Sequence, residues 1–180
     1  MSKRITVPAG QFWDPDKEEF VYTKEQTLTL EHSLLSIKRW ESKWHKPFLS
    51  NKPKTIEETV DYIRCMTLTQ NVDPRVFYAL SQENVNEINA YIEDPMTATW
   101  FSKSAQRKSR EVVTSEVIYY WMIKLGIPFE CEKWHFNQLM TLIKVCNEKD
   151  APKKKMSRSA ILSRNNELNR ARRQAMHSSG

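Results

Sequence analysis

Apolar and polar positions follow two different rhythms along the chain, and the change comes near residue 30. Before it, short apolar runs are separated by turn residues. The segment FWDPDKEEFVY has apolar ends around Asp14-Pro15-Asp16, which predicts a β-hairpin, and TLTL at 27–30 predicts a further short strand. The cross-strand pairs of the hairpin would come from four aromatic residues, Phe12, Trp13, Phe20 and Tyr22. Residues 1–30 are therefore expected to form a small N-terminal antiparallel β element.

From residue 31 onward, apolar residues recur every three or four positions, the spacing of amphipathic helices. Ser33 is a candidate N-cap of a first helix, which Pro47 would stop. A second helix starts at a capping box formed by Thr55 and Glu58. The buried face of this second helix is expected to hold Ile56, Val60 and Ile63.

Three further helical segments are expected at 81–95, 110–126 and 127–150. The middle one is the most apolar, and Gly126 is suited to the position just after its end. The last one would turn Trp134 into the core along with its aliphatic residues. The whole pattern predicts a mainly α protein with a helical core domain over residues 31–149.

The last part of the chain differs in charge. Residues 150–180 hold 8 Lys and Arg residues against 2 Asp and Glu, whereas the other 149 residues hold 20 of each sign. We expect a basic linker followed by a helical tail with a thin apolar stripe, Ile161, Leu168 and Ala175. The basic residues of this tail are Lys153, Lys154, Lys155, Arg158, Arg164, Arg170, Arg172 and Arg173. They could neutralise phosphates, but the tail has no aromatic residue to stack on bases, so nucleic acid is a weak candidate partner. Docking on a protein, or a tail that stays solvated, is at least as well supported.

Composition narrows the class of protein. With only 3 Gly residues, the chain contains neither of the glycine-rich loops that cradle phosphates. It has 3 Cys residues, no charged start followed by an apolar run, and no apolar run near the roughly 18 residues that a membrane span needs. These features predict a protein of a reducing cytoplasm that does not enter a membrane.

Metal binding and catalysis find little support. Cys131, His135 and Cys146 would share a face of a continuous helix, but the two cysteines would be about 22 Å apart along its axis. Only Cys131 and His135 could share a metal ion, and the remaining ligands would have to come from distant residues such as Cys65 or His45. No nucleophile-elbow motif is present. We therefore expect no enzyme, no metal and no cofactor.

The triplet Lys-Trp-His occurs twice, at 43–45 and 133–135. At both places the Trp would fall on the apolar stripe of a helix, with the Lys in solvent and the His at the border of the core. The flanking residues do not match each other. The repetition is therefore interpreted as two amphipathic helix faces and not as a duplicated site.

Several strings resemble a family of small phage proteins encoded with the tail genes of siphophages, the tail assembly chaperones. They are LEHSLLSIKRWESKWHKPF, TIEETVDYIRCMTL, PMTATWF and SEVIYYWMIKLGIPFECEKWH. The resemblance covers roughly residues 5–175 and brings no catalytic pattern. It implies an assembly factor in the cytoplasm of the infected bacterial host, absent from the finished particle. It also implies the partners, namely the tape measure protein, the tail tube protein and a frameshift-extended form of the chain itself.

A chaperone of this kind needs apolar surface that fits the amphipathic helices of its client. The candidate contact residues are Trp40, Trp44, Trp100 and Phe101. Trp100 and Phe101 lie in a polar segment and are the better candidates for an exposed anchor. Two other interpretations stay open: a nucleic-acid-associated phage protein acting through residues 153–173, and a structural component of the tail or neck of the virion.

Overall fold

The computed structural model describes residues 2–14, 18–101, 112–150 and 157–176. The chain divides into two compact units, Met1–Asn147 and Glu148–Gly180, which are described separately. Residues 15 and 16 of the expected turn, the tip of the polar segment and Lys153, Lys154 and Lys155 lie outside the described residues. The fold is mainly α, with small antiparallel β elements near the N-terminus, as the sequence predicts.

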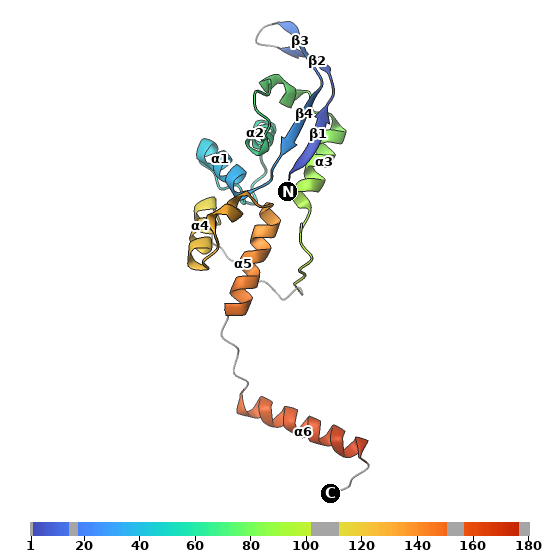
Figure 1. Cartoon of the computed structure of the whole chain (residues 1–180), viewed down its shortest axis with the longest axis vertical. Helices are drawn as coiled ribbons and strands as arrows, with labels where there is room; N and C mark the ends of the chain where they lie inside the picture. The colour runs from blue at the N-terminus through green and yellow to red at the C-terminus, as the bar shows by residue number, and fades with distance from the viewer. Residues whose placement is uncertain (1, 15–17, 102–111, 151–156, 177–180) are drawn as a thin grey trace. The chain divides into compact units, whose positions relative to one another are not determined.

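The first unit begins with strands β1 (Lys3–Val7), β2 (Gly10–Asp14), β3 (Glu19–Thr23) and β4 (Gln26–Leu30). β1 pairs with β4, and β2 pairs with β3, in both cases antiparallel (Figure 1). Ile5 and Val7 of β1 and Leu28 and Leu30 of β4 are buried, alternating with more exposed residues. Because these side chains share a core with the helices, the β1–β4 ribbon is part of the helical unit.

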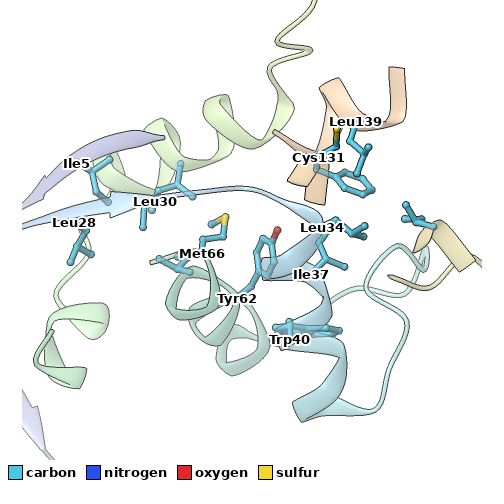
Figure 2. Packing of buried hydrophobic residues seen from close by; sticks show 14 of the residues in the cluster. Ile5, Leu28, Leu30, Leu34, Ile37, Trp40, Tyr62, Met66, Cys131 and Leu139 are labelled. Carbon is cyan, nitrogen blue, oxygen red and sulfur yellow. The ribbon is translucent and has the colours of Figure 1, made fainter. Parts of the chain in front are cut away.

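Helices make up the rest of the first unit. They are α1 (Leu34–Trp44), α2 (Ile56–Met66), the 3-10 helix η1 (Pro74–Tyr78), α3 (Gln82–Glu93), α4 (Ser115–Lys124), the 3-10 helix η2 (Phe129–Lys133) and α5 (Phe136–Asp150). Figure 2 shows side chains from β1, β4, α1 and α2 meeting in one apolar cluster, together with Cys131 and Leu139. In the second unit, α6 (Arg158–Ala175) buries none of its residues.

Local signals set the helix ends where the sequence places them. Ser33 caps α1, and Thr55 and Glu58 form the capping box of α2. Gly126 follows α4 with a φ of 64°, in the left-handed region that glycine favours. The N–H groups of Gly126 and Ile127 donate to the carbonyls of Ile123 and Met122, which completes a Schellman motif. Among the described residues, no helix combines the length and apolar character that crossing a bilayer requires.

The segment before α5 departs from the prediction. A continuous helix was expected from 127 onward, but η2 ends at Lys133 and α5 begins only at Phe136. The backbone N–H of Phe136 donates to the carbonyl of His32, and His135 forms a bridge with Ser33. These tertiary contacts hold residues 134–135 extended. As a result Trp134 is 40% exposed, and its predicted place in the core is wrong.

Candidate functional site

The described surface is hollowed between α2 and α3, where a cavity of about 370 Å³ lies open on one side. Each helix contributes residues spaced three and four apart, so an apolar stripe of α2 faces one of α3. We call this hollow the α2–α3 groove. Its lining residues are Lys54, Ile56, Thr59, Val60, Tyr62, Ile63, Phe77, Tyr78, Leu80, Val85, Ile88, Asn89 and Ile92.

The groove has a buried floor and exposed rims. Ile63 and Ile88 are 5% and 2% exposed and join the main core. Ile56 and Tyr78 are 83% and 62% exposed, so large apolar groups stand in solvent at the rims. The prediction that Ile56 lies on a buried face is therefore wrong. An apolar surface with a fixed floor and open rims is typical of a site that receives apolar side chains from a partner.

One end of the groove is closed by η1. Asp73 caps this short helix by accepting from the N–H of Arg75, and Phe77 is buried beneath it. Arg64 of α2 donates from Nη2 to the carbonyl of Pro74 at 3.2 Å and lies over the rings of Phe77 and Tyr78. These contacts tie η1 to the last turn of α2 and fix the position of the two aromatic rings.

The other end lies beside Lys54. Its ammonium group donates to the carbonyl of Phe48 at 2.8 Å and lies 4.1 Å from the centre of the Phe48 ring. Burial lowers the pKa of Lys54, an effect that the nearby carboxylate of Glu58 opposes. One of its three N–H donors is thus used inside the protein, and this bond holds Lys54 in place as a wall of the groove.

Beneath the floor lies a polar cluster that sequence analysis did not identify. Tyr62, one of the residues that line the groove, has its hydroxyl 2.5 Å from Nδ1 of His32. The backbone N–H of His32 donates to the hydroxyl of Tyr91, and Nε2 of His135 donates to the carbonyl of Tyr91 at 2.9 Å. The rings of His32 and His135 are 5.1 Å apart. Residues distant in sequence thus meet under the groove, and no local pattern could have revealed them.

This cluster has the wrong electrostatics for acid–base chemistry at neutral pH. Burial lowers the pKa of His32 to about 3, assisted by His135, and burial also lowers the pKa of His135. Burial raises the pKa of Tyr62 far above neutral. Both imidazoles are therefore uncharged and the phenol stays protonated. The cluster holds α2, α3 and the start of α1 together, and so fixes the floor of the groove.

The two tryptophans of α1 that were predicted to contact a partner are largely used inside the protein. Trp40 is 1% exposed, and its Nε1 donates to the carbonyl of Glu58 at 2.9 Å, so its role as a contact residue is excluded by burial. Trp44 is half-buried, and its Nε1 donates to Asp61 at 2.9 Å. Asp61 also pairs with Lys43. Trp44 thus joins α1 to α2 and offers only part of its ring.

Trp100 is the exposed aromatic residue that the sequence suggested. Its side chain is 84% exposed. Phe101 is half-buried, and Nζ of Lys144 on α5 lies 6.0 Å from the centre of its ring. The two candidates therefore differ: Trp100 can present its whole ring to a partner, whereas Phe101 lies partly against the body. Neither of them lines the α2–α3 groove.

The basic residues that the structure describes in the tail are all exposed on α6: Arg158, Arg164, Arg170, Arg172 and Arg173. At about 100° per residue, these five positions are spread around the whole circumference of the helix. A helix that tracks a nucleic-acid backbone would gather its cations on one side. The spacing therefore does not produce a basic stripe.

The thiols do not form a site. Cys65, Cys131 and Cys146 are free, and within the described ranges no three His, Cys, Asp or Glu residues are placed to share a metal ion. Because α5 begins at Phe136, the helical face that Cys131, His135 and Cys146 were expected to share does not exist. Burial raises the pKa of Cys65 to about 11, which keeps this thiol protonated at neutral pH.

The two Lys-Trp-His triplets occupy different structures. The first ends α1, where His45 is exposed and adopts a left-handed C-cap conformation with a φ of 51°. The second lies between η2 and α5, where His135 is fully buried. The two Lys-Trp-His triplets therefore do not form equivalent sites. The prediction that both lie on equivalent helix faces is also wrong.

Comparison with known proteins gives no assignment, because no family model, curated protein or solved structure matches the chain.

Proposed function

We propose that this chain is a tail assembly chaperone of a siphophage, which binds an amphipathic helix of the tape measure protein in the α2–α3 groove. The observation that carries the proposal is the open apolar groove, with a buried floor and large apolar groups at its rims. The resemblance of the sequence to this family supplies the identity of the client. In this proposal the protein acts in the cytoplasm of the infected bacterium and performs no chemical step.

The dimensions of the groove suit a helical client. The lining residues of α2 run from Ile56 to Ile63, and those of α3 from Val85 to Ile92. At about 1.5 Å per residue, each wall is about 10 Å long, or two helical turns. Such a groove takes two or three apolar anchors spaced i, i+3 or i+4, and i+7.

The uncharged polar groups at the walls, Thr59 and Asn89, suit a complex that must later come apart. A client whose anchors enter the groove keeps its apolar stripe out of water, which would prevent its aggregation before assembly. Recruitment of tail tube subunits, the second activity that the resemblance implies, would use a different surface, and Trp100 is the most exposed aromatic candidate for it.

The test is coexpression of the full chain with the tape measure protein of the same genome, measuring the soluble and copurified fraction of the client. The groove variant combines Ile56→Lys and Asn89→Lys, two exposed positions on opposite walls. The matched control combines Ile123→Lys on α4 and Asn86→Lys on α3, which are also exposed positions but lie outside the groove.

We expect the wild-type chain and the control to keep the client soluble, and the groove variant to lose copurification while its circular dichroism stays unchanged. Aggregation of the client even with the wild-type chain would refute the chaperone proposal. Equal rescue by the groove variant would refute the groove as the binding site.

A second candidate function rests on α6. This helix exposes five arginines against one acidic residue, Glu167, so it can attract phosphates without reading a base sequence. If the full chain binds duplex DNA through α6, log K will fall steeply with log salt, and Arg170→Gln with Arg173→Gln will flatten the slope. The dispersed placement of the arginines makes this the weaker of the two candidates.

A further inference from the structure

The β2–β3 hairpin carries an aromatic face that solvent reaches. Phe20 and Tyr22 of β3 are 58% and 70% exposed, and both point to the same side because they are two residues apart. The backbone register pairs Tyr22 with Gln11 and Phe20 with Trp13. Nε2 of Gln11 donates to the hydroxyl of Tyr22 at 3.2 Å, a bond that runs across the ribbon from β2 to β3.

The edges of the other ribbon, β1–β4, are covered by the chain itself. The N–H of Leu68 donates to the carbonyl of Thr29 at 2.8 Å, and the N–H of Thr29 donates to Oγ1 of Thr69 at 2.9 Å. On the opposite edge, Nδ2 of Asn84 donates to the carbonyl of Thr6 at 3.0 Å. These contacts prevent a further strand from adding to β1 or β4 along much of their length.

In the part of the chain that the structure describes, no third strand joins the β2–β3 hairpin (Figure 1), although the hairpin is covered at its base, where Thr23 is 6% exposed. A two-stranded ribbon is marginal in water by itself, and an exposed strand edge beside exposed aromatic rings is a template for pairing. The base of β2 approaches the body, since a Cβ on Gly10 would lie 3.4 Å from Cβ of Ala79. Because the register pairs Gly10 with Thr23, both strands are covered at this end, and the residues of β3 that stay exposed are Glu19, Phe20 and Tyr22.

We propose that the chain forms a homodimer in which β3 pairs antiparallel with β3 of a second copy, centred on Val21. The sequence of β3, EFVYT, is self-complementary in this register. Phe20 of each copy faces Tyr22 of the other, so aromatic pairs form twice and no like charges meet. The two hairpins then make one four-stranded sheet with two-fold symmetry, which is the closed arrangement of an isologous dimer.

Self-complementarity is what favours a second copy over an unrelated strand. A partner strand of arbitrary sequence would match the β3 edge through its backbone alone. The same construction on β2, centred on Phe12, would place Gln11 against Trp13 and Gly10 against Asp14, with fewer aromatic pairs and a glycine in the ladder. The dimer therefore uses β3.

The test is a charge swap measured by sedimentation equilibrium of the purified full chain without client. One variant carries Phe20→Lys and Tyr22→Lys, and the other carries Phe20→Glu and Tyr22→Glu. In the proposed register each variant alone brings like charges face to face, whereas a mixture of the two brings opposite charges together. The matched control carries Tyr120→Lys and Ile123→Lys, which are 60% and 64% exposed on α4.

We expect the wild-type chain and the control to sediment at twice the chain mass of 21.3 kDa. Each swap variant alone should dimerise at least about tenfold more weakly, and an equimolar mixture should recover the dimer. A monomeric wild-type chain, unchanged dimers of both swap variants, or a mixture that stays monomeric would each overturn the proposal. The result is independent of the groove, because the variant with Ile56→Lys and Asn89→Lys should remain dimeric even if it loses the client.

Discussion

Acid should destabilise this protein in a pH range set by its buried histidines. His32 is 3% exposed and His135 is fully buried, and burial lowers the pKa of both. Tyr62 of α2, Tyr91 of α3 and Ser36 of α1 are hydrogen-bond neighbours of this pair, and none of them is an anion. Burial lowers the pKa of His135 by more than the carboxylate of Asp94 raises it. The perturbation is therefore a change from pH 7 to pH 5.

The sign and size come from linkage between protonation and folding. In the unfolded chain a histidine takes up its proton near pH 6.5, whereas folded His32 does so only near pH 3. Between these two pH values the unfolded state binds more protons than the folded state, so stability falls as pH drops through 6.5. For His32 alone the loss between pH 7 and pH 5 is about 2 kcal/mol, and His135 adds to it in the same direction. The hydrogen bond with Lys46 lowers the pKa of Glu58 below its ordinary value of 4.5, so Glu58 affects stability only at lower pH.

The assay is urea unfolding of the full chain at pH 7 and pH 5, followed by circular dichroism. His32→Asn keeps an acceptor near the position of Nδ1 but cannot be protonated, so it should lose about 2 kcal/mol less over this range than the wild type. His45→Asn, at an exposed histidine, should lose as much as the wild type. If His32→Asn and the wild type lose equal stability, or if the ring of His32 titrates near pH 6.5 in NMR spectra, the reasoning is refuted.

Three further predictions concern single residues. Trp40→Phe shrinks a buried side chain and removes the indole donor to the carbonyl of Glu58, so it should lower the free energy of unfolding by about 1–3 kcal/mol in urea titrations. Gly126→Ala puts a side chain at a φ of 64° with open space around it, so the cost should be only about 1 kcal/mol, seen as a small drop in Tm. Cys65, with its pKa raised to about 11, should react with iodoacetamide far more slowly at pH 8 in the folded protein than in urea, as peptide mass spectrometry can show.

Features that depend on neighbours in sequence could be predicted. The caps at Ser33 and Thr55 are local, because each side chain bonds a backbone N–H three residues away. Gly126 ends α4 for an equally local reason, its tolerance of a positive φ. The mainly α fold results from the sum of such signals and from the apolar spacing.

Features that depend on distant contacts could not be predicted. Residues 134–135 continue the helical spacing of α5 toward its N-terminus, yet the bridge between His135 and Ser33 holds them extended, 102 positions from their partner. Exposure of Ile56 has the same origin. Apolar spacing showed that α2 has an apolar face, but it does not show that α3 stands far enough away to leave a cavity of about 370 Å³ in front of that face. The groove exists because of the separation between α2 and α3 in the folded chain.

The groove and the histidine cluster are joined through one side chain. Tyr62 is one of the residues that line the groove, and its hydroxyl bonds Nδ1 of His32. The groove could therefore not be widened by moving α2 outward without breaking a buried hydrogen bond, which costs about 1–3 kcal/mol. A site built in this way has its shape before the partner arrives, so less free energy is spent on ordering the protein when a helix binds. Rigidity of the floor, together with solvent-exposed apolar rims, would suit this surface to the long amphipathic client that we propose.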